Sequence, residues 1–190
     1  GMLGTGTNGK TSTTQLTASM ILADGRRVAP CGNIGVPVLD AVRDPSGFDV
    51  FVVELSSHQL HYMLASPSAE MISPVASACL NLADDHLEWH GTAEAYRDAK
   101  AVVYRNTQVA CVYNRADSAT EQMVVDAEVI EGARAISFGL DIPGRSGLGL
   151  VEGILVDRAF LDDRSSSALE ITTRDDLALS GLDAPHMVAN

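Results

Sequence analysis

Apolar residues along this chain alternate between stretches of helical spacing and short continuous runs. Residues 11–24 carry Leu16, Met20 and Ile21 at helical spacing, and the glycine that follows at Gly25 is a typical residue to end a helix. The run at residues 50–53 is continuous instead, which is typical of a strand buried on both faces. The pattern therefore predicts helices alternating with buried strands.

The elements of the first two thirds of the chain follow this alternation. Strands are predicted at residues 28–31, 50–55, 75–82 and 109–113, and further helices at residues 38–42 and 92–106. Thr92 stands at the N-cap position of the last of these helices. Alternation at this spacing predicts an α/β fold with a doubly wound, mostly parallel sheet.

The last third has a different pattern. Short strands are predicted at residues 135–138, 149–156 and 168–171, and the turns between them are rich in Gly, Asp and Ser. They predict a small, mostly antiparallel strand appendage. Residues 180–190 resemble the start of a helix that the chain end interrupts, and only three residues precede the first glycine-rich loop. We therefore expect a truncated first strand and a chain cut from a longer protein.

Composition narrows the class of protein. The chain has 190 residues, 46% hydrophobic and 20% charged, which fits one folded domain. Its formal net charge of −12 disfavours nucleic acid and anionic membranes as partners. The three cysteines are odd in number and lack C-x-x-C spacing, so they favour a reducing compartment over a disulfide framework or a zinc site. With no long apolar run and no leader, we expect a soluble, cytoplasmic protein.

A glycine-rich loop carries the strongest chemical signal. The sequence G-T-G-T-N-G-K-T at residues 4–11 matches the phosphate-loop pattern G-x-x-x-x-G-K-[S/T], between a strand and a helix. In such a loop the backbone N–H groups and the helix N-terminus face phosphate oxygens. Lys10 would neutralise phosphate charge, and the Thr11 hydroxyl would reach a magnesium ion. The loop predicts nucleotide binding.

An acidic residue stands at the end of a neighbouring predicted strand. Glu54 closes the run that begins at residue 50, at the carboxyl edge where α/β sheets hold their ligands. It could bind magnesium opposite the phosphate loop, or it could cap the turn that Ser56 and Ser57 begin. The phosphate loop favours the metal.

Two further residues are candidates for chemistry. His86 follows a predicted strand and could bind a metal or a substrate group, although a lone histidine there is more often a local hydrogen-bonding residue. Lys100 lies four residues after Tyr96 on the helix predicted at 92–106, so its side chain starts from the face of the helix that packs inward. Its simplest interpretation is that the side chain extends to the surface.

Five blocks of sequence resemble one enzyme family. The loop T-G-T-N-G-K-T at residues 5–11 resembles that of the Mur ligases and folylpolyglutamate synthases, whose mark is the asparagine before Gly-Lys. The segments G-N-I-G-V-P at 32–37 and E-L-S-S-H-Q-L at 54–60 resemble those of the Mur ligases that add D-glutamate. Further blocks lie at 81–86 and 96–100. The similarity covers nearly the whole chain.

The resemblance implies a role for each matched position. The catalytic residues would be Lys10, His86 and Lys100. The ATP contacts would be Gly6, Thr7, Asn8, Gly9, Lys10, Thr11, Ser12 and Asn190. The substrate UDP-N-acetylmuramoyl-L-alanine would lie against Asn33, Ser57 and His86. One Mg²⁺ would be held by Thr11 and Glu54, and a second by His86 with Lys100, a lysine that is carbamylated in this family and so becomes a carboxylate-like ligand.

The implied activity is an ATP-dependent amide ligation in peptidoglycan synthesis. Phosphoryl transfer from ATP to the alanine carboxylate gives an acyl phosphate, which the amine of D-glutamate then attacks. Residues 1–190 would be the central ATPase domain, without the N-terminal UDP-binding and C-terminal amino-acid-binding domains. The sequence departs from the family pattern at His58, where many members have Phe, and at Met187, where members have Asn.

Three other readings of the sequence remain open. The segment N-R-A-D at residues 114–117 loosely resembles the guanine-reading N-K-x-D of GTPases, but it lacks the lysine, and no D-x-x-G follows Glu54. The chain could also be a phosphate-loop nucleotide-binding module without catalysis. The third reading is another Mur or folylpolyglutamate-type ligase, which adds a different amino acid.

Overall fold

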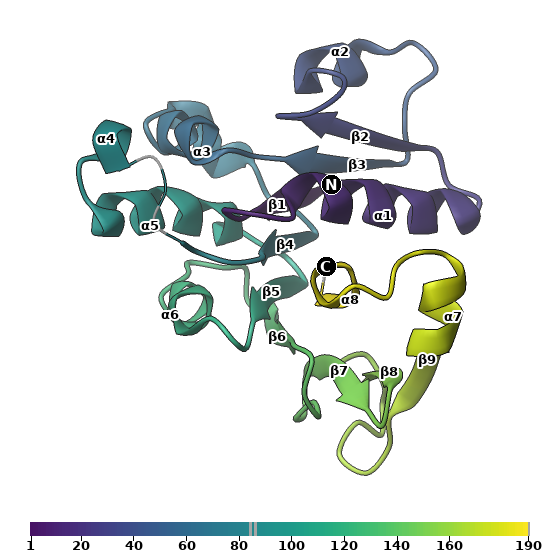
Figure 1. Cartoon of the computed structure of the whole chain (residues 1–190). Coiled ribbons are helices and arrows are strands. Elements are labelled where there is room, and N and C mark those ends of the chain that lie inside the picture. Colours follow the sequence, from purple (N-terminus) through teal and green to yellow (C-terminus); the bar gives the residue numbers. More distant parts are fainter. Residues whose placement is uncertain (84, 86, 190) are drawn as a thin grey trace.

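One continuous sheet runs through the described chain, residues 1–83, 85 and 87–189, in the computed structural model (Figure 1). Its strand order is β2-β3-β1-β4-β5-β6-β7-β8-β9. The strands are β1 (Met2–Thr5), β2 (Val28–Gly32), β3 (Val50–Glu54), β4 (Ala76–Cys79), β5 (Ala110–Asn114), β6 (Arg134–Phe138), β7 (Gly147–Val151), β8 (Ile154–Asp157) and β9 (Leu169–Thr173). The expected α/β fold with a mostly parallel sheet is confirmed.

Helices connect the strands. They are α1 (Lys10–Ala23), α2 (Val38–Arg43), α3 (Ser57–Leu64), α4 (Leu87–His90), α5 (Ala93–Ala101), α6 (Ser118–Val125), α7 (Arg174–Leu179) and α8 (Pro185–Ala189), with 3₁₀ turns at η1 (Pro67–Met71) and η2 (Val102–Tyr104). α1 packs against β1, β2 and β3, whereas α3, α5 and α6 pack side by side. No helix of the described residues is long and apolar enough to cross a membrane.

The first strand lies inside the sheet. β1 pairs in parallel with β3 on one side and with β4 on the other, and this second pairing runs from Met2 to Thr5. Although it has only four residues, β1 is therefore hydrogen-bonded on both sides. Its carboxyl end leads directly into the phosphate loop, between the ends of β3 and β4 (Figure 1). Residues that follow β3 and β4 are thus neighbours of the loop.

The antiparallel strands expected in the last third are present, with two differences. β6 still pairs in parallel with β5, and β7 in parallel with β6, so antiparallel pairing begins only between β7 and β8. The single strand predicted at residues 149–156 is wrong, because this stretch is the β7–β8 hairpin. Its turn residues Glu152 and Gly153 both have positive φ, 50° and 83°. Two such residues suit a tight hairpin turn.

Several helices were not predicted from the apolar pattern. α3 and α7 each begin with a capping box, formed by Ser56 with Gln59 and by Thr173 with Asp176. α6 begins at a cap in which the Asp117 side chain accepts a bond from Ala119 N–H. The helix predicted at residues 92–106 begins as expected, since the Thr92 side chain caps α5 by accepting from Ala95 N–H, but it continues as the 3₁₀ turn η2.

Tyr104 joins the helical layer to the sheet. Its side chain is fully buried, and its hydroxyl accepts a hydrogen bond from Cys79 N–H (3.0 Å) and donates one to Val112 O (2.7 Å). Burial raises the pKa of this phenol well above its ordinary value. The hydroxyl therefore bridges β4 and β5 in the apolar core.

Replacing Tyr104 by phenylalanine should lower the free energy of unfolding by about 1–3 kcal/mol, because the Cys79 N–H loses a buried acceptor. Urea denaturation measures this change. Tyr62→Phe is the matched control, since that side chain is 67% exposed. Equal stabilities for the two variants would contradict a structural role for the Tyr104 hydroxyl.

Candidate functional site

The phosphate loop lies between β1 and α1, at the carboxyl edge of the sheet. Gly9 is the N-cap of α1 and has φ 82°, a left-handed conformation that favours glycine. The turn at Gly9 directs the chain into a helix of 14 residues, whose first turn contains Lys10, Thr11 and Ser12. The N–H groups of a first helical turn have no partner within the helix, so they are available to an anion.

Glu54 is buried beside the loop. Only 1% of this residue is exposed, and its carboxylate accepts bonds from Thr11 Oγ1 (3.0 Å) and from Asn33 Nδ2 (3.1 Å). The backbone of Gly32, at the end of β2, lies so close to Glu54 that a Cβ on residue 32 would be 2.3 Å from Glu54 O. Glycine permits this approach, and the next residue, Asn33, is thereby placed beside the Glu54 carboxylate. Glu54 does not cap the next turn, since Ser56 and Gln59 cap α3 themselves. That alternative is therefore wrong.

The chemistry of this donor set suits a hard divalent cation. A carboxylate and a hydroxyl from residues 3.0 Å apart are oxygen ligands of the kind that Mg²⁺ binds. Both hydrogen bonds that described residues donate to Glu54 come from neutral groups, so neither brings a positive charge to balance the buried carboxylate. Thr11 and Glu54 therefore fit the magnesium role expected from the sequence.

Lys100 does not extend to the surface. The residue is 2% exposed, and its Nζ donates to Gly6 O (2.9 Å) and to Thr5 Oγ1 (3.2 Å), with the ring centre of Tyr96 at 5.0 Å. Burial lowers the pKa of Lys100 to about 8, and the charge of Lys10 contributes in the same direction. The lysine is therefore held against the phosphate loop. Its ammonium group also releases a proton more readily than that of an ordinary lysine.

A pocket of about 280 Å³ unites most of these residues. It is lined by Gly6, Lys10, Asn33, Ser56, Ser57, His58, Asp85, Tyr96 and Lys100. The chain has only two lysines, and both line this pocket. Lys10 Nζ lies over the loop, where it donates to Thr7 O (2.9 Å). Both lysine side chains thus lie where phosphate charge would need them.

Some of the expected site residues meet in the structure and others cannot be placed. Lys10, Asn33, Ser57 and Lys100 line one pocket, and Thr11 and Glu54 adjoin it through Asn33. His86 and Asn190 lie outside the described residues. Within the described part of the chain, no three His, Cys, Asp or Glu side chains are grouped as metal ligands. The second metal site and the adenine contact therefore stay predictions.

Two contacting residues were not predicted as site residues. The hydroxyl of Tyr96 is 3.0 Å from Thr7 Oγ1. The side chain of Asn81 accepts a hydrogen bond from Asn8 N–H and donates one to Asn8 O. The ring of His90 also reaches this region, since its Nε2 is 3.0 Å from Ser57 Oγ. The signal available for Asn81 and Tyr96 was that each begins one of the blocks that resemble the enzyme family, at 81–86 and 96–100.

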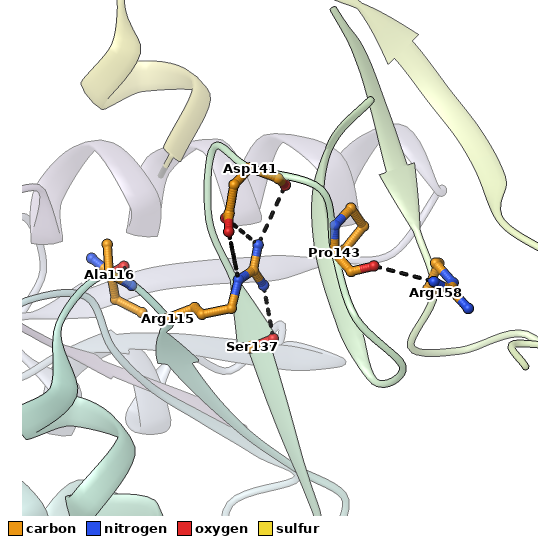
Figure 2. Close-up of polar contacts among 7 residues, drawn as sticks. Arg115, Ala116, Ser137, Asp141, Pro143 and Arg158 are labelled. Carbon is orange, nitrogen blue, oxygen red and sulfur yellow. Dashed lines mark hydrogen bonds and ion pairs between the residues drawn. The ribbon is translucent and has the colours of Figure 1, made fainter. Parts of the chain in front are cut away.

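The segment that resembles a guanine reader is engaged inside the protein. Asn114 Nδ2 donates to Leu80 O (2.9 Å), and the Asp117 carboxylate accepts from Leu82 N–H (2.6 Å). Figure 2 shows Arg115 bonded to Asp141 in the β6–β7 loop and to Ser137 on β6. These side chains bind protein groups in place of a base, so the segment gives no support to a GTPase.

Comparison with known proteins identifies relatives over nearly the whole chain. A sequence model of the Mur ligase middle domain matches residues 5–146. The UDP-N-acetylmuramoylalanine–D-glutamate ligase of Leifsonia xyli subsp. xyli is 68% identical over 186 residues, covering 98% of this chain and 36% of that protein. The protein of the same name from Streptomyces coelicolor is 53% identical, covering 98% and 38%. The chain thus spans less than two fifths of the length of these curated relatives.

Solved structures share the fold. A UDP-N-acetylmuramoyl-L-alanyl-D-glutamate–2,6-diaminopimelate ligase superposes with a TM-score of 0.66 at 21% identity, covering 98% of this chain and 44% of that one. The MurF ligase from Thermotoga maritima in complex with ADP gives a TM-score of 0.55 at 19% identity, covering 100% and 48%. At these identities the likeness concerns the arrangement of the sheet and helices.

Proposed function

The chain belongs to the Mur ligase family, and from this premise we propose that it is the ATP-binding core of a ligase that adds D-glutamate to UDP-N-acetylmuramoyl-L-alanine. The observation that carries the proposal is the pocket in which both lysines meet the Thr11–Glu54–Asn33 cluster beside the phosphate loop. A positive, oxygen-rich site of this kind suits phosphoryl transfer.

The reaction proceeds in two steps. The alanine carboxylate of the substrate attacks the γ-phosphorus of ATP, and ADP leaves as the acyl phosphate forms. The amine of D-glutamate then attacks the acyl carbon, the amide bond forms, and inorganic phosphate leaves with the electron pair of the broken C–O bond; the amine gives up a proton. Lys10, on the loop, stabilises the charge that shifts between phosphate oxygens in the first step.

Magnesium would be held by Thr11 and Glu54, and ATP by the loop from Gly6 to Ser12. When bound, the ion neutralises phosphate charge and withdraws electrons from the transferring group. Glu54 needs no rearrangement of the chain for this role, because Asn33 and Thr11 already fix both of its carboxylate oxygens. A preorganised ligand of this kind lowers the cost of binding.

The substrate would lie along the pocket wall formed after β2 and β3. Asn33 and Ser57 line that wall, and His86 would complete it from the segment after β4. Ser57 is 1% exposed, and its hydroxyl is fixed by the contact with His90 Nε2. D-glutamate as the second substrate is supported by relatives of that name at 53% and 68% identity.

A coupled assay tests the proposal. The full-length protein carrying this chain should release phosphate from ATP only when both UDP-N-acetylmuramoyl-L-alanine and D-glutamate are present, and mass spectrometry should detect the amide product. We expect the 190-residue chain alone to form little or no amide, because its relatives are more than twice as long.

The alternatives predict different outcomes of the same assay. Amide formation with another amino acid in place of D-glutamate would indicate a neighbouring ligase. ATP binding by the full-length protein without any amide would indicate a nucleotide-binding module. Efficient ligation by the 190-residue chain would contradict the need for other domains.

A further inference from the structure

The segment that follows β4 is hydrogen-bonded to Thr7 and Asn8, which form the crest of the phosphate loop. The Asn81 side chain accepts from Asn8 N–H (2.8 Å) and donates to Asn8 O (3.0 Å), and Asn81 O accepts from Thr7 N–H (3.0 Å). One residue therefore makes three hydrogen bonds to two consecutive loop residues, across a sequence separation of 73 from Asn8. Such pairing fixes the backbone at the crest from outside the loop.

The crest is held through a side chain as well. Thr7 Oγ1 accepts from Ala83 N–H (3.0 Å), lies 3.3 Å from Ala83 O, and is 3.0 Å from the Tyr96 hydroxyl. Tyr96 is 2% exposed and belongs to α5, four residues before Lys100. The loop is thus attached to the segment after β4 at both Thr7 and Asn8.

The N-R-A-D segment fixes this attachment in turn. Asn114 Nδ2 bonds Leu80 O, and the Asp117 carboxylate bonds Leu82 N–H, so both chain neighbours of Asn81 are held from the end of β5. Asp117 also caps α6 through Ala119 N–H (3.1 Å). The contacts form a continuous series from the start of α6, through Leu80 and Leu82, to the loop.

These bonds determine which loop amides can face an anion. The N–H groups of Thr7 and Asn8 are occupied by Asn81, whereas the first-turn amides of α1 have no partner within the helix. Phosphate binding by backbone amides depends on several N–H groups converging in a fixed concave arrangement. Holding the crest therefore keeps the remaining amides oriented toward the phosphates.

We infer that Asn81 is a positioning residue for the phosphate loop, and that Asn114 and Asp117 act through it in place of reading a base. The inference rests on the proposed function, since the loop that Asn81 positions is taken to bind ATP. Asn81 contacts the loop backbone, so it affects catalysis by orienting the loop amides that bind the phosphates.

The test compares variants of the full-length ligase in steady-state kinetics. Asn81→Ala should raise KM for ATP about 10- to 100-fold, because both side-chain bonds to Asn8 are lost. KM for the UDP-linked substrate should change little. Asp117→Asn should raise KM for ATP by a smaller factor, since one of its two acceptor oxygens becomes a donor. Gln108→Ala is the matched control, because its amide bonds Ser73 O (2.7 Å) before the start of β5, at the opposite edge of the sheet.

Hydrogen exchange separates positioning from general loss of stability. In Asn81→Ala the Asn8 amide should exchange at least about 10-fold faster while amides of β3 and β5 keep their protection. Equal KM for ATP in Asn81→Ala and Gln108→Ala, or exchange that quickens across all strands alike, would overturn the inference. If the unsubstituted ligase neither binds ATP nor forms amide, the proposed function itself fails, and the phosphate role of Asn81 fails with it.

Discussion

Replacing Lys10 by alanine is expected to abolish magnesium-dependent ATP binding, with a loss of affinity on the order of 100-fold or more. Lys10 is one of only two lysines in a chain of net charge −12, and its ammonium lies over the loop within the pocket. Without it, the loop would have only backbone amides, and no ammonium group of its own, to balance the charge of the triphosphate beside the acidic Glu54. Calorimetric titration of ATP and magnesium into the 190-residue chain measures the loss.

A second cation, just beyond the end of the same helix, provides the control for Lys10. Arg26 follows the C-terminal end of α1 and pairs with Asp24 (3.1 Å), and its side chain is 62% exposed. Arg26→Ala removes the same formal charge far from the loop, so it should leave ATP affinity unchanged. GTP serves as the competing nucleotide. Equal affinities in the two variants would refute the phosphate role of Lys10, and a strong preference for GTP would revive the GTPase reading.

The site residues that could be predicted are those whose signal is local in sequence. The phosphate loop is recognised from a motif of eight consecutive residues, and Glu54 stands at the end of a continuous apolar run. Both follow from one rule, because the carboxyl ends of parallel strands hold the ligands of α/β sheets. Lys100 was placed on the inward face of its helix by spacing, but its burial against Gly6 could not be read from spacing alone.

The residues that were missed depend on contacts between distant parts of the chain. Asn81 and Tyr96 reach the loop from 73 and 89 residues away, and the family resemblance of the blocks that they begin does not indicate which group each side chain contacts. In the fold, the β7–β8 hairpin was predicted as one strand because Glu152 is a poor signal for a turn. Its φ of 50° is uncommon for a non-glycine residue, and the pairing of β7 with β8 on either side of the turn stabilises it.

Replacing Lys100 by methionine in the full-length ligase should lower kcat by about 100-fold or more while KM for ATP changes less, if the lysine serves the transferring phosphoryl group through a carbamate. Formation of that carbamate requires the neutral amine, which attacks CO₂ and loses a proton. With a pKa of about 8, roughly one amine in ten is neutral at pH 7, a far larger share than for an ordinary lysine. Methionine has a similar length and tolerates burial, so the variant should fold.

The same pKa gives a stability signature with a defined sign. The folded pKa of about 8 lies below the ordinary value of 10.5, so between these values the unfolded chain binds more protons at Lys100 than the folded one. The contribution of Lys100 to the free energy of unfolding therefore rises with pH from about 8 to 10.5, and its cost is fully present below pH 8. Urea denaturation of the 190-residue chain and of Lys100→Met at the same series of pH values isolates this contribution: the unfolding free energy of the unsubstituted chain minus that of Lys100→Met should rise between about pH 8 and 10.5.

Labelled bicarbonate identifies the modification directly. In ¹³C NMR the 190-residue chain should show a carbamate signal that Lys100→Met loses and Lys10→Ala keeps, and the assignment is limited to three amines, namely these two lysines and the α-amino group of Gly1. A signal that persists in Lys100→Met would place the carbamate elsewhere. Normal kcat in Lys100→Met would show that the buried amine only supports the loop through Gly6 and Thr5. The kinetic and spectroscopic results together thus distinguish a carbamylated lysine that serves the reaction from a structural lysine.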